Sequence, residues 1–454
     1  MDRTSGEGHL TAESPADSDP DEQASDLIAR SRAVGDVSFT AVVDGADDPR
    51  ILWAAPDGLE IAGRGIATRF TATGPDRFDR IRTRAERVFE TLEYDGPVVA
   101  RPRAFGGFSF HDGHESTPPW TGFDAASFVV PRAFVTRTER DGVWLTVVSD
   151  STDDAEERLD RWDDRLTEGP TMCSSGSGPG VASTHRTTSP SVWASQIERA
   201  LDRIETDRLV KVVLAQALSV DLESAVDVPE TLERLRRQYP NCYRFLVGQG
   251  GGGTFFGAPP ERLVSKRGED VETEALAGSA PRGETPESDD EYADRMCDDE
   301  KLQHEHDLVV RAIREQLDPL ARELTIADRR VRKLATIQHL QTPIAATLEC
   351  DRHVLELVEA LHPTPAVGGV PPDRAWETIR ETETFDRGWY AAPVGWFDGD
   401  GDGEFAVGLR SAVTSGETAT LFAGNGIVAD SDPAEEWEEV ELKFRPILDE
   451  LRDR

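Results

Sequence analysis

The chain contains 454 residues, and its 87 Asp and Glu residues against 50 Lys and Arg residues give a net charge of −37 at pH 7. Binding to DNA or RNA needs clustered basic side chains that carboxylates do not outnumber, so this composition argues against a nucleic-acid partner. An acidic surface with few lysines is typical of proteins that stay soluble in concentrated salt, which predicts a halophilic, cytoplasmic protein.

Residues 1–33 are rich in Asp, Glu, Ser, Gly and Pro, and we expect them to form a disordered acidic tail. The sequence has no run of 18 apolar residues, and it begins without the basic and apolar segments of an export signal. We therefore expect no membrane span and no export. The four cysteines form no CxxC pair, which argues against a zinc site. We expect a monomer or a weak homodimer.

The remaining chain is predicted to form three parts. Residues 34–167 contain β-rich segments such as VSFTAVV and SFVVPRAFVTR, with a helix near 76–92, and form an N-terminal sheet-forming part. Residues 168–191 are rich in Ser, Gly, Pro and Thr, which predicts a linker. Residues 192–454 alternate helices and strands. Together these patterns predict an α+β fold with two stacked antiparallel β-sheets and helices on the outside.

Two Gly-rich segments resemble ligand-binding loops but lack the required context. Gly248, Gly250 and Gly253 have the GxGxxG spacing, yet a strand follows them instead of a helix, so we expect a hairpin turn. FDGDGDGEF begins like a calcium loop at Asp398, but position twelve is Leu409 where the bidentate Glu should be. We interpret this second segment as a polar turn between strands.

The last predicted helix carries charged residues on one face. Glu436, Glu439 and Lys443 are spaced i, i+3 and i+7, so they lie together beside an apolar stripe that contains Val440 and Phe444. The Gly-rich turn AGNGIVADSDP before this helix can bring backbone N–H groups close to an anionic ligand. Spacing alone is also compatible with a solvated, salt-adapted helix.

The segment FAGNGIVADSDPAEEWEEVELKF resembles the C-terminal signature of the chorismate-utilising enzymes, which include isochorismate, salicylate, anthranilate and aminodeoxychorismate synthases. Further motifs of this family occur in the same order, at VKVVLAQ, APPERLV, TEALAGSAPRG, EHDLVV, IQHLQTPIAATL, LHPTPAVGG, RGWYAAPVGW and VGLRSA. The resemblance implies the family's pair of stacked antiparallel sheets with outer helices. It also implies a buried site for chorismate and Mg²⁺.

The resemblance assigns roles to individual residues. Glu305 and Glu439 would ligate Mg²⁺, and Glu436 would be a further ligand or lie close by. An Arg suits a bidentate carboxylate and a Lys suits a point charge. The substrate-binding groups implied in this way are Gly278, Tyr390, Arg410, Gly424 and Lys443. His339 and His362 lie in motifs that resemble site-lining segments, and a structural hydrogen-bonded role is equally compatible with both.

Two further residues bear on the reaction. Lys211, one of only five lysines, resembles the base that activates water in isochorismate and salicylate synthases. Glu261 resembles the general acid that protonates the departing C4 hydroxyl, which requires a raised pKa. Ala277 stands where aminodeoxychorismate synthases often have a nucleophilic Lys. The resemblance therefore implies a Mg²⁺-dependent isomerase that adds water at C2 of chorismate and yields isochorismate, for menaquinone biosynthesis.

Three alternatives stay open at this point. A salicylate synthase would make isochorismate and then eliminate pyruvate, and the residues named above do not separate the two. An anthranilate synthase component I would use ammonia, which the lysine at position 211 argues against. A non-catalytic acidic binding protein would be expected to lack a metal carboxylate or the acid–base pair. The sequence departs from the family pattern at Gln216, Ser279 and Asn425.

Overall fold

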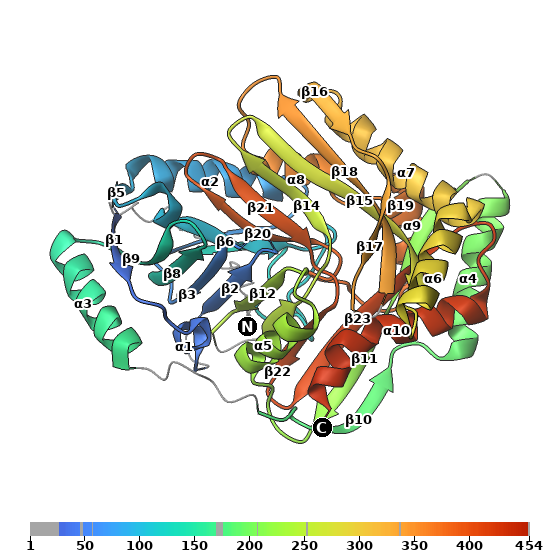
Figure 1. Ribbon diagram of the computed structural model, residues 1–454, viewed down its shortest axis with the longest axis horizontal. Coiled ribbons are helices and arrows are strands. Elements are labelled where there is room, and N and C mark those ends of the chain that lie inside the picture. The colour runs from blue at the N-terminus through green and yellow to red at the C-terminus, as the bar shows by residue number, and fades with distance from the viewer. Residues whose placement is uncertain are drawn as a thin grey trace, which may run out of the picture.

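The computed structural model describes residues 27–452 apart from 46–48, 57, 169–175, 207, 251–252 and 336. Two large sheets form the body of this part, and helices cover their outer faces (Figure 1). The predicted α+β arrangement is therefore confirmed. Among the described residues, no helix is long and apolar enough to span a membrane.

The first sheet has 13 strands within the described residues, and every pair is antiparallel except β1 with β5. Its spatial order is β10 (Val181–Arg186), β11 (Lys211–Leu222), β23 (Thr418–Ile427), β22 (Ser411–Ser415), β13 (Thr254–Gly257), β12 (Arg244–Gly248), β2 (Arg50–Ala54), β3 (Glu60–Arg64), β8 (Ala133–Thr138), β9 (Gly142–Ser149), β1 (Ile28–Val34) and β5 (Glu93–Asp95), with β19 (Gly369–Val370) beside β11.

The second sheet has ten strands in the same part of the chain. Its order is β16 (Ala321–Ile326), β18 (Ile337–Leu348), β15 (Asp270–Pro281), β14 (Arg262–Arg267), β21 (Gly403–Val407), β20 (Pro393–Asp398), β6 (Arg103–Phe108), β7 (Ala126–Val130) and β4 (Thr68–Ala72), with β17 (Arg330–Lys333) beside β18. The helices are α1 (Phe39–Val43), α2 (Arg77–Thr91), η1 (Val98–Ala100), α3 (Thr152–Glu168), α4 (Pro190–Glu205), α5 (Val228–Gln238), α6 (Pro286–Asp298), α7 (Glu300–Leu317), α8 (Val354–Leu361), α9 (Pro372–Thr382) and α10 (Pro433–Leu451).

The N-terminal and C-terminal parts of the chain share both sheets. Strand β2 pairs with β12, and β6 pairs with β20, so the N-terminal strands extend each sheet at one end of the strands from the predicted catalytic region. The strands that flank the two Gly-rich segments pair as the predicted turns require, since β12 pairs with β13 and β20 pairs with β21 as antiparallel neighbours. Residues 251–252 of the first segment lie outside the described residues. The sheet-forming part is thus built into the body that holds the C-terminal strands.

Two predicted boundaries are wrong. Residues 1–26 of the predicted tail lie outside the described residues, but residues 28–33 belong to β1, which pairs with β9 and fully buries Ala29. The predicted linker at 168–191 also contains ordered structure. Strand β10 lies along the edge of β11, and α4 begins at Pro190 after Ser189, whose side chain accepts the Val192 N–H. Strand β10 has a largely polar sequence, and β1 mixes apolar residues with Arg and Ser, so hydrophobic alternation did not reveal them.

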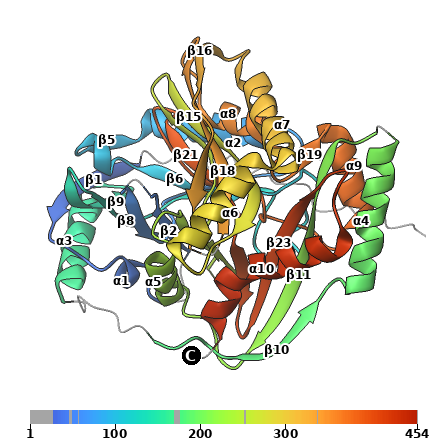
Figure 2. The same cartoon turned by 45° about the vertical axis from the view of Figure 1, so that its right-hand side comes forward.

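Helices α7 and α10 occupy the region where the two sheets come together. Figure 2 shows α10 lying across β23 and β11 of the first sheet, and α7 running along β15 and β18 of the second. Helix α10 begins after Asp432, whose carboxylate accepts the N–H groups of Ala434 and Glu435, and it buries Val440 and Phe444. Between these helices and strands lies a cavity.

Candidate active site

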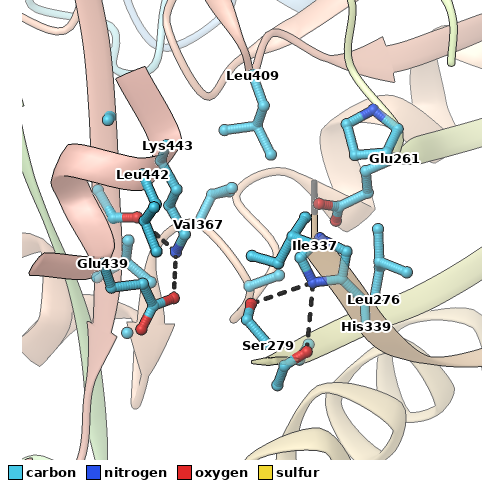
Figure 3. A pocket seen from close by; sticks show the side chains of 18 of the residues that line it. Glu261, Leu276, Ser279, Ile337, His339, Val367, Leu409, Glu439, Leu442 and Lys443 are labelled. Atoms are coloured by element: carbon cyan, nitrogen blue, oxygen red, sulfur yellow. Dashed lines mark hydrogen bonds and ion pairs between the residues drawn. The ribbon is translucent and has the colours of Figure 1, made fainter. Parts of the chain in front are cut away.

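A cavity of about 600 Å³ lies between the two sheets, and residues of β11, β15, β18, β23, α7 and α10 line it. In Figure 3, Glu439 and Lys443 of α10 face Glu261 and His339 across this cavity. The structure brings all ten predicted site residues to its lining: Lys211, Glu261, Gly278, Glu305, Tyr390, Arg410, Gly424, Glu436, Glu439 and Lys443. Residues up to 232 positions apart in the sequence, from 211 to 443, thus converge on one space.

Lys211 and Glu305 form an ion pair at the floor of the cavity. Lys211 is the first residue of β11 and is 1% exposed, and its Nζ lies 2.8 Å from Glu305 Oε1. Burial alone would raise the pKa of Glu305, but the adjacent Lys211 ammonium lowers it below its usual value. Gly426 of β23 makes room for this pair, because a Cβ there would lie 2.7 Å from Lys211 Cε and 2.8 Å from Glu305 Oε1.

Glu261 is a buried carboxyl group that retains its proton near neutral pH. It lies between Pro260 and strand β14, is 4% exposed, and its backbone oxygen accepts the Val407 N–H at 3.2 Å. Burial, and then the nearby carboxylate of Glu274, raise the pKa of Glu261 from 4.5 to about 8, while Lys211 opposes the rise. A carboxyl group in this state can donate a proton inside the cavity.

The charged face of α10 is held together by a network. Lys443 Nζ donates to Glu439 Oε1 at 2.8 Å, to Asn425 Oδ1 at 2.8 Å and to the Gly424 carbonyl at 3.0 Å. Asn425 in turn donates from Nδ2 to Glu436 Oε2 at 3.0 Å. Burial, and further the Glu439 carboxylate, raise the pKa of Glu436. Asn425, which departs from the family pattern, therefore connects two of the predicted site residues.

Arg410 and Tyr390 supply polar groups from loops next to the second sheet. Arg410 has a φ of 46° and makes no ion pair within the described part of the chain. Its guanidinium lies 4.0 Å from Cys242 Sγ and 5.7 Å from the ring centre of Tyr239, and burial lowers its pKa. The Tyr390 ring stacks on Phe422 at 5.3 Å, and burial raises the pKa of the Tyr390 hydroxyl. A half-buried guanidinium without an ion pair is suited to binding an anion.

The two histidines have different positions. His339 lines the cavity, and its Nδ1 lies 3.1 Å from Ser279 Oγ and 3.3 Å from the Gly278 carbonyl. His362 is not among the cavity-lining residues, and its Nε2 donates to the Phe110 carbonyl at 3.1 Å. Burial lowers the pKa of each imidazole to about 3, so both are neutral at physiological pH.

A buried ion pair behind the cavity braces the strand that carries Lys211. Arg387 donates from Nε to Glu383 Oε2 at 2.8 Å, from Nη2 to the Val213 carbonyl at 2.7 Å and from Nη1 to the Val367 carbonyl at 2.9 Å. Glu383 Oε1 accepts the Ala215 N–H at 2.8 Å. The two side chains thus provide the hydrogen bonds that a neighbouring strand would make along this stretch of β11.

The family model described as "Chorismate binding enzyme" matches residues 14–452 of the chain. The chain belongs to this family. It is 35% identical over 416 residues to the protein named isochorismate synthase MenF of Bacillus subtilis, covering 88% of each chain. It is also 35% identical over 440 residues to the salicylate biosynthesis isochorismate synthase of Pseudomonas aeruginosa, covering 94% of this chain and 90% of the other.

The fold of this chorismate-binding enzyme also matches a solved structure. The structure of MenF, described as the menaquinone-specific isochorismate synthase from Escherichia coli, superposes with a TM-score of 0.79 at 27% identity and covers 94% of both chains. The predicted family and the predicted architecture of stacked sheets are therefore confirmed.

The carboxylates of this chorismate-binding enzyme can be tested for their fit to Mg²⁺. Within the described residues, no group of three His, Cys, Asp or Glu side chains is gathered tightly enough to hold a metal by itself. Glu305, Glu436 and Glu439 nevertheless line the same cavity. Proteins commonly hold Mg²⁺ by one or two carboxylates, with water and substrate oxygens completing the shell. This donor set therefore fits Mg²⁺.

Sequence reasoning missed two kinds of site residue. Gly426 was not singled out, although it is the second glycine of the segment GNGIV. The predicted Gly-rich turn is wrong here, because Gly424, Asn425 and Gly426 belong to strand β23 and pair with β11. The requirement for space next to Lys211 appears only in the folded chain. The Glu383–Arg387 brace was also missed. Its one local signal is the i, i+4 spacing of Glu and Arg, which is common on exposed helices and so carries little information.

Proposed function

We propose that this protein is an isochorismate synthase, which converts chorismate to isochorismate. One observation supports this most strongly: a buried lysine and a buried, protonated carboxyl group, Lys211 and Glu261, line the same cavity. The reaction needs a base to activate water and an acid to release a hydroxyl group. The two side chains supply these opposite functions, and the relatives named as isochorismate synthases support the assignment.

In the proposed reaction, Lys211 Nζ in its neutral form takes a proton from a water molecule whose oxygen bonds to C2 of the ring. The ring double bonds shift, and the bond from C4 to its hydroxyl oxygen breaks. Glu261 gives its proton to the departing hydroxyl, which leaves as water. One water molecule is consumed and one released, so the change is an isomerisation, and proton exchange with solvent restores both side chains.

The remaining polar groups bind the substrate in this proposal. Chorismate carries two carboxylates, and the unpaired Arg410 guanidinium and the Lys443 ammonium are the cations suited to them. The backbone at Gly278 and Gly424 and the Tyr390 hydroxyl complete the binding surface. His339 is neutral and held by Ser279, so it adds no charge near the ring.

Glu305 and Glu439 are the residues that would hold Mg²⁺, with Glu436 as a further ligand or a close neighbour. When bound, Mg²⁺ would neutralise the ring carboxylate of chorismate. Each of the two ligand carboxylates now has a lysine beside it, at 2.8 Å in both cases. As ammonium groups these lysines balance the negative charge of the cavity, and Lys211 must release its proton before it acts as the base.

The biological setting is part of the same proposal. We infer a role in menaquinone biosynthesis, because relatives are named MenF and the matching structure is described as menaquinone-specific. The net charge of −37 supports work in the cytoplasm of a salt-adapted cell. Restoration of menaquinone in a bacterium that lacks its own isochorismate synthase tests the pathway.

Incubation of the purified protein with chorismate and Mg²⁺, followed by chromatographic separation of products, tests the activity. We expect isochorismate alone. Salicylate and pyruvate formed without a second enzyme would identify a salicylate synthase, and an ammonia-dependent product would identify an amination. Lys211→Ala and Glu261→Gln are each expected to lower kcat by about a hundredfold or more. Lys333→Ala, outside the cavity lining, is the matched control and should keep full turnover.

A further inference from the structure

Glu274 lies directly behind the proposed general acid. It belongs to β15, which pairs with β14 from Ser265 opposite Glu272 to Arg267 opposite Asp270. Beyond this ladder, Glu274 Oε1 accepts the backbone N–H of Arg262 at 3.2 Å, and Arg262 is the residue that follows Glu261. A carboxylate side chain thus fixes the backbone next to Glu261 from the side opposite the cavity.

Glu274 is itself paired with a cation. Arg332 of β17 donates from Nη1 to Glu274 Oε1 at 3.0 Å and from Nη2 to the Asn241 carbonyl at 2.8 Å. The other oxygen of Glu274 accepts from the Gln341 side-chain amide. The Glu274 and Arg332 side chains are only 11% and 17% exposed, so water screens their charges weakly.

This ion pair borders a second cavity of about 700 Å³, which Tyr243, Arg262, Arg330 and Gln341 also line. Glu261 lines the first cavity and not the second. The Glu274–Arg332 pair therefore stands between the proposed general acid and a separate cleft. Its charges act on the acid without occupying the space of the substrate.

The charges around Glu261 have opposing effects on its proton. Burial is the largest cause of its raised pKa, the Glu274 carboxylate adds to the rise, and the Lys211 ammonium and the Arg332 guanidinium reduce it. Three different elements supply these charges, since Lys211 lies in β11, Glu274 in β15 and Arg332 in β17. The other titratable or charged groups of the same cavity are Lys301, Glu305, His339, Tyr390, Arg410, Glu435, Glu436, Glu438, Glu439, Lys443 and Arg445.

We propose that Glu274 and Arg332 are positioning residues that set the proton affinity of Glu261 from behind the active site. The Glu274 carboxylate favours retention of the Glu261 proton at the moment when a hydroxyl group must leave. The Arg332 guanidinium limits this effect, so that the proton can still be transferred. This inference rests on the role as general acid proposed above for Glu261.

The pH profile of kcat/KM tests the proposal, because its alkaline limb reports loss of a proton from the free enzyme. Glu274→Gln removes one negative charge and should move this limb to lower pH by roughly one unit. With a limb near pH 8, kcat/KM at pH 8 then falls about fivefold, with little change at pH 6. Arg332→Gln should move the limb in the opposite direction. Glu272→Gln is the matched control, since Glu272 lies on the same strand, faces the same second cavity and is exposed.

The alkaline limb is expected to shift in opposite directions in Glu274→Gln and Arg332→Gln, which distinguishes this role from a purely structural one. Disruption of a merely structural ion pair would lower the rate of both variants at every pH and leave the limb in place. A limb that stays in place, or that moves in the same direction in both variants, would overturn the proposal. The Glu272→Gln variant should keep the wild-type limb, and a shift in it equal to that of Glu274→Gln would also overturn the specific role of Glu274.

A second measurement keeps this inference apart from the proposed function. For the wild type and for each variant, a second protein is made that also carries Glu261→Gln. The free energies of unfolding of the two proteins, with and without Glu261→Gln, are then compared as a function of pH. The pH at which the difference levels off reports proton release by Glu261 without any catalysis. If Glu261→Gln keeps its turnover, the role of Glu261 as acid fails while this measurement still tests Glu274. If Glu261→Gln is inactive and neither readout moves, only the inference about Glu274 and Arg332 fails.

Discussion

Replacement of Glu261 by glutamine is expected to stabilise the protein as the pH rises, at the same time as it abolishes turnover. Burial and the charge of Glu274 raise the pKa of Glu261 from 4.5 to about 8 in the folded protein. Below pH 4.5 the carboxyl group is protonated in both the folded and the unfolded chain, so its burial does not make the free energy of unfolding depend on pH. Between pH 4.5 and 8 only the unfolded chain releases the proton, which favours unfolding.

The size of this effect follows from the two pKa values. One pKa unit corresponds to about 1.36 kcal/mol, so the ionised carboxylate costs the folded state about 5 kcal/mol well above pH 8. The cost is about 1 kcal/mol at pH 5 and about 4 kcal/mol at pH 8. Glutamine has nearly the same shape and no charge. The free energy of unfolding of the variant should therefore gain about 3.5 kcal/mol relative to wild type between these two pH values.

Urea unfolding of both proteins at fixed salt concentration, repeated at several pH values, measures this difference. All other titrating groups are common to both proteins, so their contributions cancel. A difference that is constant with pH would refute the raised pKa, because it would mean that Glu261 releases its proton at the same pH in both states. A difference that falls as the pH rises would mean that the folded protein stabilises the carboxylate, contrary to a role as acid.

Three further predictions concern the same region. Gly426→Ala should lower kcat by about tenfold or more with little loss of stability, because the added Cβ displaces only the flexible ends of Lys211 and Glu305. Steady-state kinetics and thermal melting measure the two effects. Glu305→Gln should raise the Mg²⁺ concentration for half-maximal activity by about tenfold, measured by Mg²⁺ titration, and an unchanged titration would argue against its role as ligand. Arg387→Gln should lower the free energy of unfolding by about 3–5 kcal/mol, because it leaves the Glu383 carboxylate buried without its cation. The double variant Glu383→Gln, Arg387→Gln should recover part of this loss.

The architecture was predictable from family motifs, but the pairing of strands was not. Residues such as Ile51 and Val247 are opposite each other in β2 and β12 although they lie almost 200 positions apart, and no local pattern specifies such a contact. Strand β10 has the sequence VASTHR, and each of its residues is half-buried or exposed. Its order comes from hydrogen bonds to the edge of β11, which a composition rich in Ser and Thr does not reveal.

The candidate site shows the same division between local and non-local information. The ten predicted residues lie in motifs that can be read one at a time, and each motif reaches the same cavity. The hydrogen bond from Arg262 to Glu274 and the space that Gly426 leaves for Lys211 depend on contacts between strands distant in sequence. Such supporting residues have ordinary sequence surroundings, so they become visible only when the sheets are assembled.

The distribution of lysines links the composition of the chain to its chemistry. Three of the five lysines line the candidate active-site cavity, namely Lys211, Lys301 and Lys443, in a chain with forty-five arginines. Scarcity alone is no guide to function, because Lys266 is also fully buried and pairs with Asp402 at 3.0 Å, away from this cavity. Lysine at position 211 is required by the proposed mechanism, since a guanidinium does not release its proton.

The structure gives Lys443 a reason of a different kind. An arginine could also bind a carboxylate, so charge alone does not explain a lysine here. The Lys443 ammonium, however, donates to acceptors on three separate groups: the Glu439 carboxylate, the Asn425 amide oxygen and the Gly424 carbonyl. An ammonium projects three donors from a single atom, whereas the donors of a guanidinium lie in one plane and are spread over three nitrogens. Lys443→Arg should therefore break this network and release Asn425 from Glu436, and its kcat/KM should fall although the positive charge is kept.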